Sequence, residues 1–192
     1  MKIQFLDAEM LCWENGDCPH GQTNHIIQLG IVEVESETLK IIRRKSYFVR
    51  PQSKHFEVSD YCTKLTGITR SKIIDEGHYF PEVMRTIKKE FAPQTKITYA
   101  WGSDYEPISE HCAKYSCPNP WSINGILDFG ILWRSAYNQK YKLPLSEALE
   151  SVGLKFRGRP HDAENDAGAL ADLHNEMLIT IRSHTRNRSA KK

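Results

Sequence analysis

No stretch of the sequence is apolar over the roughly 20 residues that a membrane-spanning helix needs, so we expect no membrane partner. The five cysteines are an odd number and include no C-x-x-C pair, which argues against a disulfide framework and a structural zinc site. The amino-terminal segment MKIQFLDAE carries carboxylates within its apolar run, unlike a secretory signal. These absences predict a cytoplasmic protein in a reducing compartment.

A strong charge of either sign is also missing. The formal net charge is only +2, so the net charge by itself does not point to a nucleic-acid partner. The 192 residues, 40% of them apolar, suffice for one domain with a full core, and we predict that it spans residues 1–182. The last ten residues, SHTRNRSAKK (183–192), carry four basic residues and no acid. We expect a frayed tail there, with a nucleic-acid-binding arm as the alternative.

The pattern of apolar residues predicts strands first and helices later. Residues 2–9, 25–35 and 39–51 are predicted strands with short connections, which favours an antiparallel meander. Two further strands are predicted over 96–101 and 122–127, and helices over 59–69, 80–91, 103–115, 128–138, 144–154 and 163–182. We therefore predict an α/β domain in which three antiparallel strands are followed by parallel strands in one mixed sheet, flanked by helices.

Asp7 and Glu9 stand one residue apart on the first predicted strand, in a run that is otherwise apolar. Strand alternation places both side chains on the same face, with their Cα atoms about 7 Å apart. Burying two unpaired carboxylates of like charge is costly, so a positive partner is expected. A pair of divalent cations about 3.5–4 Å apart would need several shared oxygen ligands, so further acidic residues are expected elsewhere.

Later residues can supply the rest of such a site. Asp104 directly follows the strand at 96–101, at the carboxyl end where open α/β sheets bind ligands, although it could instead only favour the start of the next helix. Asp166 lies one turn before the apolar stripe of the last helix, whereas Asp162 is better placed as that helix's cap. His161, just outside the helix, is either a surface residue or, beside a metal-binding aspartate, a candidate general base.

Taken together, D-x-E on the first strand, an aspartate after a later strand and H-x4-D at the last helix form an ordered set. This set resembles the DEDDh exonucleases, a branch of the ribonuclease-H-like 3′→5′ exonucleases, over residues 1–182. The segments CWE, NHIIQLG, SDYCTKLTGIT and YAWGSDYE are most similar to the Eri-like exoribonuclease branch, which is associated with trimming the 3′ ends of structured or small RNAs. The resemblance implies a ribonuclease-H-like fold.

The resemblance also implies roles for individual residues. Asp7, Glu9, Asp104 and Asp166 would be the ligands of two Mg²⁺ or Mn²⁺ ions, and His161 would deprotonate the attacking water. The segment LTGI matches the part of the family that packs against the terminal nucleotide, although a helix C-cap would explain its glycine equally well. The substrate-binding residues expected on this basis are Ala8, Met10, Leu65, Thr66, Gly67, Ile68 and Trp101.

The activity implied by the resemblance is removal of 5′-mononucleotides from the 3′ end of single-stranded RNA. A DNA-trimming or proofreading-type exonuclease is the alternative, because RNA is distinguished through 2′-hydroxyl contacts that a sequence does not display. A non-catalytic nucleic-acid-binding member of the fold is a second alternative. Such proteins typically lose a ligand or the histidine, whereas this chain retains all five residues.

Overall fold

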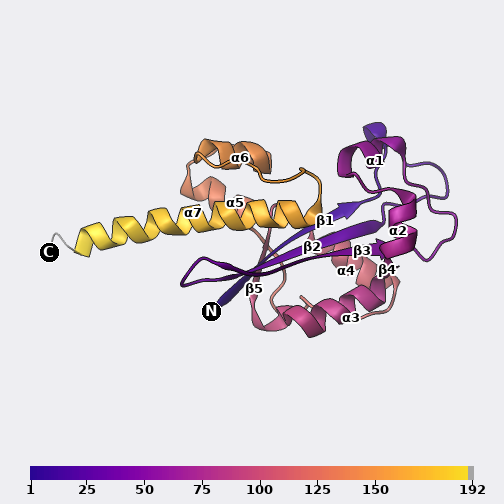
Figure 1. The fold of residues 1–192 in the computed structure, drawn as a ribbon, viewed down its shortest axis with the longest axis horizontal. Helices are drawn as coiled ribbons and strands as arrows, with labels where there is room; N and C mark the ends of the chain where they lie inside the picture. Colours follow the sequence, from indigo (N-terminus) through magenta and orange to yellow (C-terminus); the bar gives the residue numbers. More distant parts are fainter. Residues whose placement is uncertain (190–192) are drawn as a thin grey trace.

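A six-stranded mixed sheet forms the centre of the structure, a computed structural model that describes residues 1–189 (Figure 1). In space the strands follow the order β4-β3-β2-β1-β5-β6. β1 pairs antiparallel with β2, and β2 with β3, whereas the β1/β5, β5/β6 and β3/β4 pairs are parallel. The strands are β1 (Lys2–Met10), β2 (Ile26–Glu35), β3 (Ile41–Arg50), β4 (His78–Tyr79), β5 (Ile97–Ala100) and β6 (Leu127–Asp128). The predicted α/β class and antiparallel meander are confirmed.

Helices cover both faces of the sheet and bury separate clusters of apolar side chains (Figure 1). On one face, Phe5 of β1 and Val32 of β2 pack with residues of α5 (Phe129–Ala136), α6 (Leu145–Ser151) and α7 (Ala163–Ser189). On the other face, Leu6 and Leu29 pack with α3 (Phe80–Phe91) and α4 (Tyr105–Lys114). Asp7 and Glu9 alternate in register with Phe5, so they face the side of the sheet that α7 covers.

The remaining short elements are two helices, one strand and two 3₁₀ turns. The helix predicted over 59–69 is α1 (Asp60–Thr66), which ends at Gly67 in the left-handed conformation with a φ of 77°. A second helix, α2 (Arg70–Glu76), and the two-residue strand β4 follow it and were not predicted. The 3₁₀ turns are η1 (Glu14–Gly16), within the loop that follows β1, and η2 (Pro93–Thr95). In the part of the chain that the structure describes, we find no helix with the length and apolarity of a membrane span.

The strand predicted over 122–127 is wrong. Only Leu127 and Asp128 pair with β5, and the residues before them form turns. The apolar side chain that suggested alternation, Ile123, is 73% exposed, and Gly125 has a φ of 67°, outside the range of strands. The Asn124 side chain instead donates hydrogen bonds to the carbonyls of Gln94 and Lys96, which ties this turn to the segment before β5.

The last helix is longer than predicted. It continues from the expected end at residue 182 to Ser189, so the first part of the predicted frayed tail is helical; residues 190–192 lie outside the described residues. The guanidinium of Arg182 donates to the carbonyls of Ser36 and Glu37, at 2.5 and 3.1 Å, in the turn between β2 and β3. This contact joins α7 to the turn between β2 and β3 next to the end of the apolar stripe.

Gly30 on β2 allows the start of α7 to lie directly on the sheet. A Cβ atom at position 30 would fall 2.1 Å from the carbonyl carbon and oxygen of Ala163. Gly30 pairs with Asp7 on the neighbouring strand. The absence of a side chain at this one position therefore sets how closely the first turn of α7 approaches the strand that carries Asp7 and Glu9.

We predict that Gly30→Ala destabilises the protein by about 1–3 kcal/mol or more, the usual range for overpacking, because the added methyl meets backbone that cannot rotate away. Urea denaturation would measure the change. Gly168→Ala is the matched control: it lies in α7 itself, and the only atom near its added Cβ is the Arg44 side chain at 3.7 Å. That variant should be neutral or more stable by about 0.4–1 kcal/mol. Equal effects of both substitutions would contradict this reading of Gly30.

Candidate functional site

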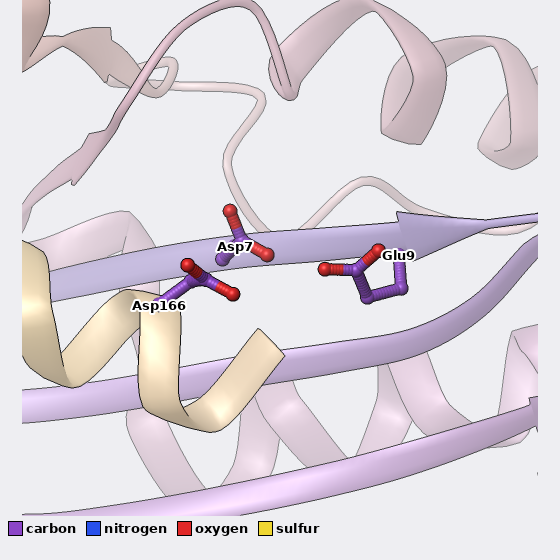
Figure 2. Close-up of side chains that lie close together, drawn as sticks. All are labelled: Asp7, Glu9 and Asp166. Carbon is purple, nitrogen blue, oxygen red and sulfur yellow. The ribbon is translucent and has the colours of Figure 1, made fainter. Parts of the chain in front are cut away.

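Three carboxylates meet where α7 begins over β1. One oxygen atom each of Asp7, Glu9 and Asp166 lies within 4.8 Å of the other two. Figure 2 shows the three side chains pointing toward a common space, two of them from the strand and one from the first turns of the helix. The D-x-E spacing thus places two acids on one face, as predicted, and the chain brings a third from a position more than 150 residues later.

Burial and mutual repulsion make these groups difficult to ionise. Burial first, and then the charges of Asp104, Asp166, Glu9 and Asp162, hold the pKa of Asp7 well above its usual value. Burial and the neighbouring aspartates raise the pKa of Glu9 to about 8. Burial, with a contribution from Asp162, raises the pKa of Asp166 to about 7, although the backbone N–H groups of His161 and Asp162 oppose this rise. The cluster therefore disfavours ionisation of its own carboxylates, and the backbone donors offset only part of this cost.

The chemistry of the donor set fits a divalent cation. Among the ion pairs of the described residues, none involves Asp7, Glu9 or Asp166. The Oδ2 atom of Asp166 is buried and has no hydrogen-bond partner among the described residues. Carboxylate oxygens are the ligands that hard divalent cations prefer, and a cation would satisfy this oxygen and offset the repulsion. The residues present are therefore those that a metal centre requires.

Asp104 lies beside this cluster without belonging to its closest group. It stands at the start of α4, directly after β5, and its carboxylate makes no hydrogen bond that caps the helix. The carboxylate instead interacts with the backbone N–H of Ala8, between the two acids of β1. Burial raises its pKa to about 6, against the opposing effect of Lys142. The predicted Asp104 is thus brought to the site, since its charge is the largest electrostatic cause of the raised pKa of Asp7.

A cavity of about 310 Å³ opens over the carboxylates. His161 lines it with an exposed side chain, and its backbone has a φ of 58°, at the turn that precedes α7. Trp101 also lines it, and its indole N–H donates to the carbonyl of Leu143 at 3.1 Å. Of the residues predicted from the sequence, the cavity brings together Asp7, Ala8, Glu9, Trp101, His161 and Asp166.

The other predicted substrate-binding residues do not line this cavity. Thr66 and Ile68 are buried, at 3% and 2% exposure, and the Thr66 hydroxyl accepts from the N–H of Ile68 and donates to the carbonyl of Cys62. Their side chains therefore shape the end of α1. Leu65, Gly67 and Met10 are half-buried around it. Arg159 joins this segment to the turn before His161, because its guanidinium donates to the carbonyl of Lys64 at 2.6 Å.

Two residues that position the site were not predicted from the sequence. Gly30 admits the helix, and Gln28, fully buried on the same strand, hydrogen-bonds its first residues. The prediction that Asp162 caps the helix is confirmed, since its Oδ1 accepts from the N–H of Asn165 at 3.1 Å. The available signal was a glutamine and a glycine, two residues apart, inside the apolar run IIQLGIVEV. A buried polar side chain in such a run requires partners.

Known proteins with similar sequences and folds were found by comparison. A family model described as Exonuclease matches residues 5–174. The chain is 29% identical to ERI1 exoribonuclease 2 of Mus musculus, over 90% of this chain and 28% of that protein. It is 27% identical to 3'-5' exoribonuclease 1 of Mus musculus, over 92% of this chain and 52% of that protein. The chain thus spans about half the length, or less, of these relatives.

A solved structure shares the fold along nearly the whole chain. The nuclease domain of 3'hExo, described as a DEDDh family member bound to rAMP, aligns with a TM-score of 0.78 at 24% identity. The alignment covers 93% of this chain and 92% of that one. The predicted ribonuclease-H-like fold is confirmed by this likeness.

The raised pKa values predict how the metal-free protein responds to pH. Carboxylates titrate near 4 in an unfolded chain, whereas Glu9 and Asp166 in the folded protein do so at about 8 and about 7. Between these values the folded state binds more protons, so the free energy of unfolding should fall as pH rises from about 4 to about 8. Urea denaturation in EDTA across this range would measure the fall.

Asp7→Asn is the matched variant for this measurement, because it removes one of the repelling charges. Its unfolding free energy should decline less steeply over the same range, and added Mg²⁺ should reduce the decline of the original protein. Parallel curves for the two proteins without metal would show that the cluster does not repel itself as inferred.

Proposed function

The chain belongs to the exonuclease family, and we propose on that premise that it is a metal-dependent 3′→5′ exonuclease that releases 5′-mononucleotides from the 3′ end of single-stranded RNA. The observation that carries the proposal is the convergence of Asp7, Glu9 and Asp166 on one space beneath a cavity that His161 also lines. A structural ion-pair network would include lysine or arginine side chains. A cluster that consists of buried acids alone is more consistent with cation binding.

Asp7, Glu9, Asp104 and Asp166 are proposed to hold two ions, Mg²⁺ or Mn²⁺. When bound, these ions supply positive charge against the scissile phosphate and the oxygen that leaves. The carboxylates themselves hold that charge in place from three elements, the strand β1, the start of α4 and the helix α7. The backbone N–H groups of Ala8, His161 and Asp162 interact favourably with two of the four carboxylates.

His161 is proposed to take the proton from the attacking water through a ring nitrogen. Its side chain is exposed at the cavity, so it can reach a water molecule over the carboxylates without itself being one of the clustered ligands. A positioned base of this kind typically contributes 10²–10⁴-fold to a rate. Ala8 and Trp101, which line the same cavity, are proposed to contact the terminal nucleotide.

RNA is proposed as the substrate in preference to DNA. The support is that both reported relatives are named exoribonucleases. Leu65 and Gly67, at the end of α1, remain the residues proposed to contact the terminal nucleotide from that side, with Thr66 and Ile68 holding the segment in shape. The DNA-trimming alternative is decided by direct comparison of the two substrates.

We predict that single-stranded RNA is shortened from its 3′ end. RNA and DNA oligonucleotides of one sequence, labelled at either end, would be incubated with Mg²⁺ or Mn²⁺. The 5′-labelled RNA should give a descending ladder and the 3′-labelled RNA a labelled mononucleotide from the first time point, with slower loss of DNA. Asp166→Asn, which removes a ligand charge, should be inactive although folded. Cleavage of a circular RNA would exclude an exonuclease, and faster loss of DNA would favour the alternative.

A second prediction concerns His161. His161→Ala should lower turnover by roughly 10²–10⁴-fold while leaving Mn²⁺ binding and RNA binding nearly unchanged, because the imidazole is proposed to move a proton and to hold no ion. Single-turnover cleavage at saturating metal would measure the loss. Added imidazole should restore part of the activity, since the cavity is open to solvent. A loss of Mn²⁺ affinity, or unchanged turnover, would remove His161 from this role.

A further inference from the structure

Gln28 connects the sheet to the start of α7 through every polar group of its side chain. It is fully buried on β2, directly opposite Glu9. Its Nε2 donates to Oδ2 of Asp162 at 3.1 Å and to the hydroxyl oxygen of Ser46 at 2.9 Å. Its Oε1 accepts from the backbone N–H of Ala163 at 3.0 Å. Two of these three contacts lead to the helix, and the third leads to β3.

Asp162 in turn hydrogen-bonds residues of the first turn of α7, which carries Asp166. Its Oδ1 accepts from the N–H of Asn165 at 3.1 Å, and its carbonyl accepts from the N–H of Asp166 at 2.9 Å. The backbone N–H groups of His161 and Asp162 also interact favourably with the Asp166 carboxylate. A series of hydrogen bonds therefore runs from the strand beside Glu9, through Asp162, to the backbone of Asp166.

We propose that Gln28 is a positioning residue for the site: through its paired contacts with Asp162 and Ala163 it sets where Asp166 and His161 stand relative to Asp7 and Glu9. The catalytic part of this inference rests on the proposed function, whereas the positional part concerns the protein alone. Gln28 is not proposed to contact substrate or metal. Its effect is exerted through the first turn of α7.

An amide is the group that this position requires. Its nitrogen faces a carboxylate and its oxygen faces a backbone N–H, so donors and acceptors match on both sides. A glutamate of the same shape would set an acceptor against Asp162 and add charge beside Glu9. An apolar side chain would leave the buried N–H of Ala163 without a partner, which is also unfavourable.

The test exchanges the two partners. Gln28→Glu places two acceptors against each other, and Asp162→Asn places two donors against each other. Combining the substitutions restores one donor and one acceptor, because the new asparagine can donate to the new glutamate, and the net charge returns to that of the original protein. Asp162 is partly exposed, so Asp162→Asn tests the contact even if Gln28→Glu does not fold.

Ser46→Ala is the matched control, since it removes a hydrogen bond of the same Nε2 that leads to β3 and not to the helix. Amide hydrogen exchange of residues 161–166 in the metal-free protein is the first measurement, because it needs no substrate. Mn²⁺ affinity, kcat and KM on 3′-labelled RNA complete the set.

Each single variant should exchange residues 161–166 faster, bind Mn²⁺ more weakly and lose kcat by about 10²-fold, the effect of misplacing a reacting group by roughly 1 Å, with KM little changed. The double variant should regain most of each loss, and Ser46→Ala should match the original protein. Unchanged exchange in both single variants, or losses that multiply in the double variant, would overturn the proposal. If exchange and Mn²⁺ affinity follow the expected pattern while no variant cleaves RNA, the positioning role stands and the proposed function fails.

Discussion

The repulsion among buried carboxylates is the constraint on which the rest of the site depends. Asp7, Glu9 and Asp166 would separate if their supporting elements allowed it, because burial raises the pKa of each and neighbouring acids add to the rise. The fold keeps them together by placing them on a central strand and on the start of a helix, each fixed by its own packing. Backbone N–H donors offset part of the charge, and the remaining excess is what a divalent cation would neutralise.

The parallel pairing of β1 with β5 brings the fourth acid to the same place. Asp104 follows β5, and because the two strands run in the same direction, their carboxyl ends lie side by side. The backbone N–H of Ala8, between the two acids of β1, interacts with the Asp104 carboxylate. Segments that are about 100 and 160 residues apart in sequence converge on a few ångströms of one strand. Such a site is held on rigid elements, which suits chemistry that depends on position.

Features of the fold and the site that are set by neighbouring residues could be predicted from the sequence, whereas features set by contacts between distant residues could not. The period of two residues in a strand placed Asp7 and Glu9 on one face, and the proline and aspartate before the last helix identified Asp162 as its cap. The prediction of a strand at 122–127 was wrong because Ile123 contributes to an alternating apolar pattern in the sequence but is exposed in the structure. The prediction ended the last helix at residue 182 because the apolar stripe ends at Ile181, whereas the helix continues to Ser189. Thr66 and Ile68 share a motif with their neighbours, but the fold buries them.

The two neutral residues opposite the acids show why the strand pair acts as one unit. Across the ladder, Asp7 faces Gly30 and Glu9 faces Gln28. The position opposite Asp7 has to be without a side chain, because the backbone of Ala163 occupies the space that a Cβ would fill. The position opposite Glu9 has to carry a donor and an acceptor together, because a carboxylate and an N–H of the same helix turn face it. A third acid can be brought to D-x-E on β1 only if β2 seats the helix that carries it, and Q-x-G is the pattern that does so here. The neutral residues thus fix the distances among charges that would otherwise drive the elements apart.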